Sequence, residues 1–166
     1  MKKIILALTL VALLLTSCSH DSDHNTINGV WILTEWNVAD GFDMNNDDIV
    51  NTNILNEIDC VNNETLVFES TGMVSSNKTF NPTIEIALQN GTSNNYIFNI
   101  VCDEEGSISY ASNYSKNGDV VLINDAIATV KNNKLTRVFI GAIKIYNEDF
   151  TEVLASKDLT LVYTKQ

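Results

Sequence analysis

From residue 29 onward the chain is a series of short segments in which apolar and polar residues alternate, and this pattern constrains the fold most strongly. In segment 83–89, Ile84, Ile86 and Leu88 alternate with polar residues such as Glu85. Successive side chains of a β-strand point to opposite faces, so such a segment has one buried and one solvated face. We expect strands at residues 29–38, 64–70, 72–77, 83–89, 96–103, 107–113, 119–124, 126–132, 134–146 and 159–165.

The segments are separated by short polar breaks such as Asn117-Gly118 and Asn132-Asn133. Asn and Gly tolerate the left-handed backbone of tight hairpins, so neighbouring strands are expected to pair antiparallel. Eight to ten such strands must protect their edges. The sequence therefore predicts an all-β fold, an up-and-down antiparallel barrel of about eight strands, with a two-sheet β-sandwich as the alternative.

The first seventeen residues have a different character. Met1-Lys2-Lys3 precedes an apolar segment of twelve residues, 4–15. This segment is too short to span a membrane as a helix and has the length of the core of a secretory signal.

The segment ends in Leu15-Thr16-Ser17-Cys18, which resembles the lipobox of bacterial lipoproteins. The resemblance implies that the chain is cut before Cys18, that the Cys18 sulfur is diacylated, and that the new amino terminus is acylated. Two or three fatty acyl chains anchor a protein to a membrane durably. The alternative is an ordinary signal peptide in which the cysteine occurs by chance.

Three regions follow: a removed signal peptide (1–17), the lipidated cysteine with a polar tether (18–28), and one domain (29–166). Sorting in Gram-negative bacteria disfavours inner-membrane retention unless Asp follows the lipidated cysteine. Ser19 follows it here, so the resemblance implies an outer-membrane lipoprotein of the cell envelope, facing the periplasm or the cell surface.

The domain is strongly acidic. Once Lys2 and Lys3 are removed, 8 basic residues remain against 21 acidic ones. Such a chain repels nucleic acid, so we expect no nucleic-acid partner.

With Cys18 lipidated, Cys60 and Cys102 are left. Because exported proteins enter an oxidising compartment, we predict a Cys60–Cys102 disulfide. Two buried free thiols are the alternative.

Gly29-Val30-Trp31 resembles the Gly-x-Trp motif that opens the first strand of lipocalins, and the likeness to lipocalin-like bacterial lipoproteins extends over most of 29–165. The resemblance implies a barrel and does not name a ligand. No second lipocalin motif is evident near Arg137.

Two functions are consistent with this fold, and neither is enzymatic. The first is binding of a small apolar ligand inside the barrel or at its mouth, lined by residues such as Trp31, Phe68, Phe98 and Tyr110. The second is a structural role, in which side chains fill the barrel and its loops contact another envelope protein. An open barrel needs a cavity of several hundred cubic ångströms, which the sequence does not reveal.

The long segment between the first two expected barrel strands carries oxygen ligands at alternate positions. Asp43, Asn45 and Asp47 have the spacing that begins a calcium loop, so a structural calcium ion is a hypothesis. The alternative is an acidic loop held by side-chain to backbone hydrogen bonds. Downstream, Ile49, Ile54, Leu55 and Ile58 fit either one face of a short helix across the barrel mouth or an irregular loop pinned by Cys60.

Overall fold

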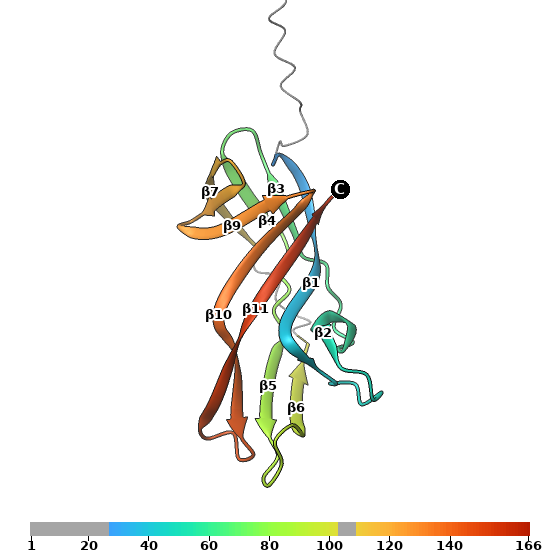
Figure 1. Ribbon diagram of the computed structural model, residues 1–166. Coiled ribbons are helices and arrows are strands. Elements are labelled where there is room, and N and C mark those ends of the chain that lie inside the picture. The colour runs from blue at the N-terminus through green and yellow to red at the C-terminus, as the bar shows by residue number, and fades with distance from the viewer. Residues whose placement is uncertain (1–26, 103–108) are drawn as a thin grey trace, which may run out of the picture.

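The computed structural model describes residues 27–102 and 109–166, which form an all-β chain (Figure 1). The predicted leader and Cys18 lie outside the described residues. The strands are β1 (Gly29–Phe42), β2 (Asn51–Asn53), β3 (Thr65–Phe68), β4 (Met73–Ser76), β5 (Thr83–Leu88), β6 (Tyr96–Val101), β7 (Tyr110–Asn117), β8 (Val120–Ile123), β9 (Ala126–Lys131), β10 (Lys134–Asn147) and β11 (Val153–Lys165). One 3-10 turn, η1 (Ile54–Asn56), follows β2.

Eight of the strands close into a barrel in the order β1, β3, β4, β7, β8, β9, β10 and β11, and β11 pairs with β1. Every neighbouring pair in this ring is antiparallel. The ring follows chain order, which confirms the predicted up-and-down barrel; the two-sheet sandwich is wrong. Closure leaves the barrel without a free edge.

Asparagine and aspartate form the tight turns of the barrel. Asn124 and Asp125 join β8 to β9 with φ of 47° and 66°, and Asn132 and Asn133 join β9 to β10 with φ of 50° and 60°. Two successive residues with positive φ give the hairpin turn whose twist matches that of paired strands. The predicted turn at Asn132-Asn133 is confirmed.

The β10–β11 hairpin continues past the barrel into the lower half of Figure 1. Its pairing shifts between Phe139 and Ile143, where Gly141 has φ 59° and donates its N–H to Asp158 Oδ1 at 2.7 Å. Such a bulge bends the strand pair. Beyond it β5 pairs in parallel with β10 and also pairs with β6. The β5–β6 hairpin, inserted between β4 and β7, therefore extends the sheet outside the ring.

The apolar core runs through both parts of the molecule. Trp31 is 1% exposed, and its indole N–H donates to the Ile27 carbonyl at 2.7 Å. Ile27 is itself buried, so the packed body includes two residues before the expected start at 29. The largest fully buried side chains are Trp31, Tyr163, Phe42, Phe68, Leu33, Ile54, Leu66, Ile86, Leu135, Val38, Val74 and Val121.

Several predicted boundaries were wrong. The first strand continues to Phe42, because Phe42 is buried against the second part of the core. The strand expected at 107–113 is β7, which begins at Tyr110, and the closing strand begins at Val153 because it pairs with the outer half of β10. The helix considered for residues 49–58 does not form: this stretch contains β2 and η1, with Ile54 buried and Ile49 59% exposed.

Candidate functional site

A cavity of about 530 Å³ lies against β7–β11, and we call it the barrel cavity. Its volume falls within the usual range for small-ligand sites. The walls combine apolar and polar side chains. The lining residues are Glu64, Thr79, Tyr110, Ala111, Ser112, Ile123, Asn124, Ala126, Arg137, Phe139, Leu161 and Tyr163.

A buried carboxylate belongs to this lining. Glu64 is 7% exposed, and its two oxygens accept hydrogen bonds from the Tyr163 hydroxyl and from the Phe80 N–H, the latter at 2.7 Å. Burial, reinforced by the Glu64 charge, strongly raises the pKa of Tyr163, so this phenol stays protonated and donates. Both Glu64 oxygens are thus supplied with donors from the protein.

Arg137 is the only arginine of the chain, and its half-buried guanidinium also lines the barrel cavity. The Cζ atom lies 5.0 Å from the centre of the Phe139 ring. Within residues 27–102 and 109–166 the guanidinium forms no ion pair. Burial raises the pKa of the neighbouring Tyr110, an effect opposed by the Arg137 charge and by a hydrogen bond that Arg137 donates to the Tyr110 hydroxyl, so this hydroxyl is protonated at neutral pH.

Thr79 contributes a polar group without a hydrogen-bond partner among the described residues. Its Oγ1 is buried and has no hydrogen-bond partner among the described residues. Most buried polar atoms are hydrogen-bonded, so an unpartnered hydroxyl in a cavity wall is a candidate contact for a ligand.

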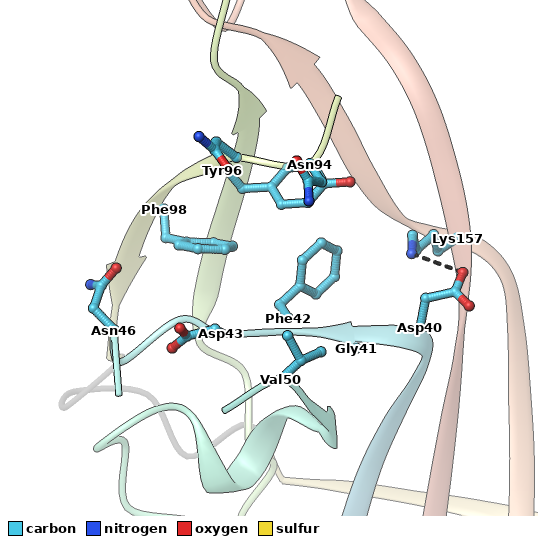
Figure 2. Close-up of a pocket in the computed structure, with 11 residues that line it drawn as sticks. Asp40, Gly41, Phe42, Asp43, Asn46, Val50, Asn94, Tyr96, Phe98 and Lys157 are labelled. Atoms are coloured by element: carbon cyan, nitrogen blue, oxygen red, sulfur yellow. Dashed lines mark hydrogen bonds and ion pairs between the residues drawn. The ribbon is translucent and has the colours of Figure 1, made fainter. Parts of the chain in front are cut away.

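A separate cavity of about 490 Å³, which we call the side cavity, lies where the end of β1 meets β6 and β11. Figure 2 shows Phe42, Tyr96 and Phe98 converging on it. The Phe42 ring packs edge to face against Tyr96 at 5.2 Å and against Phe98 at 5.9 Å between ring centres. The complete lining is Asp40, Gly41, Phe42, Asp43, Asn46, Val50, Asn94, Asn95, Tyr96, Phe98 and Lys157.

Lys157 borders the side cavity from β11. Its ammonium donates to the Ala39 carbonyl at 3.0 Å, pairs with Asp40 at 3.4 Å, and lies 5.2 Å from the centre of the Phe42 ring (Figure 2). The backbone next to it is tight, since a Cβ added to Gly41 would lie 2.2 Å from the Asn51 carbonyl oxygen. The end of β1 is therefore closely constrained.

The predicted disulfide is confirmed: Cys60 and Cys102 are bonded, with a Cα–Cα distance of 5.3 Å. Cys60 follows η1, and Cys102 follows β6. The bond links the loop segment between β1 and β3 to the β5–β6 hairpin, and these two segments supply most of the side-cavity wall.

The structure separates the four residues that the sequence grouped as ligand contacts. Trp31 and Phe68 are 1% and 2% exposed, pack edge to face at 6.3 Å, and line neither cavity. Tyr110 lines the barrel cavity, and Phe98 lines the side cavity. Trp31 and Phe68 therefore act in packing in this structure.

Asp43, Asn45 and Asp47 lie together in the loop after β1 and are held by local hydrogen bonds. The two Asp43 oxygens accept from the N–H groups of Asp47 and Asp48, both at 3.1 Å, and Asp47 accepts from Ile49 N–H at 2.9 Å. The buried Glu57 carboxylate accepts from the Met44 N–H at 2.9 Å and from the Asn51 amide. In the part of the chain that the structure describes, no three His, Cys, Asp or Glu residues are arranged to hold a metal ion.

Sequence reasoning missed the charged residues of the barrel cavity. Arg137 lies between Leu135 and Phe139 on the same face of β10, so the strand period alone places it inward. Glu64 precedes β3, and its burial depends on Tyr163, 99 residues away, which no local pattern indicates.

A scan against protein-family models and searches of curated proteins and of solved structures found no match to this chain. Among the residues described, no helix has the length and apolar character needed to cross a membrane.

Proposed function

We propose that this protein is a lipid-anchored, lipocalin-like binding protein of the Gram-negative cell envelope that holds a small apolar ligand in the barrel cavity. The observation that carries the proposal is the cavity of about 530 Å³ in a closed barrel of eight strands. A barrel of this size either fills with side chains or retains space for one ligand. Ile123, Leu161 and Phe139 supply apolar wall for such a ligand.

The binding function is tested by filling the cavity. Ala126 lines it from the start of β9, whereas Ala155 is an exposed residue of β11 that lines neither cavity. We expect the apolar dye N-phenyl-1-naphthylamine to fluoresce on binding the unmodified protein. Ala126→Phe should weaken that binding at least about tenfold, because the added ring occupies ligand space, while Ala155→Phe should leave it unchanged. Equal binding by all three proteins would contradict the proposal.

Membrane attachment through Cys18 is supported by the lipobox resemblance of residues 15–18. Cys18→Ala should abolish incorporation of a labelled fatty acid and release the protein from the membrane fraction. Continued incorporation would contradict the anchor.

A structural role with an envelope protein as partner remains the second candidate. It is favoured by Val61 and Val101, which adjoin the two disulfide cysteines and are 78% and 55% exposed. Exposed apolar side chains that lie close together are typical of interaction surfaces. Cross-linking of the protein in intact cells, compared between the unmodified chain and a Val61→Ser, Val101→Ser variant, tests this role. A product lost only in the variant would support it.

A further inference from the structure

The side cavity has an aromatic wall that the protein leaves partly open. Tyr96 and Phe98 are two positions apart on β6, so both rings lie on the same face of the strand, and both are partly exposed. Phe42 packs edge to face against the two rings from the end of β1 and is 2% exposed (Figure 2). Phe42 is therefore the base of the wall, and the two rings of β6 keep part of their surface for another group.

Side-chain amides surround this wall. Asn46 lies in the loop after β1, and Asn94 and Asn95 lie in the turn between β5 and β6. Within residues 27–102 and 109–166, these amides and the Tyr96 hydroxyl have no hydrogen-bond partner. Each amide group offers a carbonyl acceptor and N–H donors. The cavity thus presents donors and acceptors together at the rim of an apolar surface.

Both loops that carry these amides are held in place by the protein. The two Asp43 oxygens accept hydrogen bonds, both at 3.1 Å, from backbone N–H groups of the loop that contains Asn46. In the β5–β6 turn the Gln89 N–H donates to the Asn95 carbonyl at 2.9 Å, and the Thr92 hydroxyl donates to the Gln89 carbonyl at 2.7 Å. A ligand therefore does not have to order these loops, which lowers the free-energy cost of binding.

The charges at the side cavity are matched within the protein. Lys157 pairs with Asp40 at 3.4 Å, and the Asp43 carboxylate accepts hydrogen bonds from its own loop. A cationic ligand would meet the Lys157 ammonium, and an anionic ligand would meet the two carboxylates, so like charges disfavour both. A wholly apolar ligand would desolvate the amides without replacing their hydrogen bonds. These conditions select an uncharged ligand that has hydroxyl groups and an apolar face.

A sugar combines these two properties. Its hydroxyl groups both donate and accept hydrogen bonds, and the C–H groups on one face of its ring pack on the electron-rich face of an aromatic ring. We propose that the side cavity binds a neutral saccharide, which stacks on Tyr96 and Phe98 and is hydrogen-bonded by Asn46, Asn94 and Asn95. The volume of about 490 Å³ lies within the range of small-ligand sites.

This inference is independent of the apolar ligand proposed for the barrel cavity, because the two cavities share no lining residue. It gives the protein a second binding site of different chemistry. The site is built from the end of β1, the β5–β6 hairpin and β11, and it lies at the second part of the apolar core.

The test is a titration of the purified full chain with maltotetraose, cellotetraose, xylotetraose and N-acetylchitotetraose, followed in the amide NMR spectrum. The unmodified protein should bind at least one of these sugars. Tyr96→Ala should weaken that binding at least about tenfold, because it removes a stacking surface. Asn94→Ala should weaken it about twofold to tenfold through the lost hydrogen bond. Asn90→Ala removes an exposed amide of the same hairpin that lines neither cavity, and it should leave binding unchanged.

The Ala126→Phe variant separates the side cavity from the barrel cavity. It should bind the sugar as the unmodified protein does, and a loss of binding in this variant would place the sugar in the barrel and overturn the assignment. An amide spectrum of Asn94→Ala that matches the unmodified protein away from the substitution shows that this variant is folded.

Three other results would overturn the proposal. The first is that the unmodified protein binds none of the sugars. The second is that Tyr96→Ala and Asn94→Ala both bind as tightly as the unmodified protein. The third is tighter binding of the anionic tetragalacturonate or of the cationic chitotetraose than of the neutral sugars, which would contradict an uncharged ligand.

Discussion

The Tyr163 hydroxyl donates a hydrogen bond to the Glu64 carboxylate inside the barrel, which connects β11 to the segment that enters β3. Both residues are buried, at 0% and 7% exposure. A buried carboxylate that loses a donor keeps a charged oxygen without that hydrogen bond, so this contact is expected to matter for stability.

Tyr163→Phe removes that donor with little change of shape. We expect the free energy of unfolding to fall by about 1–3 kcal/mol, the usual cost of leaving a buried polar group unsatisfied. The matched control is Tyr146→Phe, since the partly exposed Tyr146 hydroxyl has no hydrogen bond among the described residues. Denaturant unfolding of the two variants checks this, and equal losses would show that the Glu64 contact contributes nothing.

The ion pair between Lys134 and Glu35 gives the barrel a small pH-dependent contribution. Its atoms are 2.7 Å apart, and the hydrogen bond from Lys134, with one from Asn37, lowers the Glu35 pKa below its ordinary value of 4.5. Because the folded pKa is the lower one, the stabilisation is present above pH 4.5 and is lost as pH falls through the folded pKa. Lys134→Met should cost less than about 1 kcal/mol at neutral pH, because the pair is solvent-exposed.

The pH profile of unfolding checks the Lys134 prediction. The difference between Lys134→Met and the unmodified protein should shrink on acidification and in high salt. A difference that is constant with pH would assign the loss to packing of the lysine stem instead.

The Cys60–Cys102 bond closes a loop of 42 residues. Replacing both cysteines by serine should lower the free energy of unfolding by about 3–4 kcal/mol, because the unfolded chain regains the entropy of that loop. Hydrogen exchange should increase in β5, β6 and the segment from 43 to 60, since the bond joins these parts, and should stay slow in β10–β11. Uniformly increased exchange would show that the bond stabilises the whole barrel equally.

Replacing Asp43 in the loop after β1 tests the calcium hypothesis. Asp43 accepts hydrogen bonds from two backbone N–H groups, so Asp43→Ala should destabilise the protein by about 1–2 kcal/mol even in the presence of a chelator. Thermal unfolding with EDTA and with calcium separates the roles. A loss seen only when calcium is present would identify Asp43 as an ion ligand.

Strand period and turn residues predicted the barrel because they are local signals, as Asn132-Asn133 illustrates. The order of the strands in space could not be predicted from these local signals. The alternating sequences of β5 and β6 resemble those of the barrel strands. The β5–β6 hairpin nevertheless lies outside the ring, where β5 pairs in parallel with β10, and no turn residue indicates this pairing. Likewise Phe98 alternates as a barrel residue would, and it lines the side cavity.

The Cys60–Cys102 pair was predicted by counting the cysteines of a chain that was expected to be exported. The barrel cavity did not follow, because Glu64, Arg137 and Tyr163 come from distant segments and meet only when the ring closes. Aromatic content alone pointed to Trp31 and Phe68, which the same closure buries in the core.

The central claim, that the barrel holds a small ligand, is tested most directly by native mass spectrometry of the chain after export and purification without detergent. The account predicts an adduct on the order of a few hundred daltons that organic extraction removes and that Ala126→Phe fails to retain. A bare chain from the unmodified protein, matching the mass of the Ala126→Phe variant apart from the substitution, would contradict it.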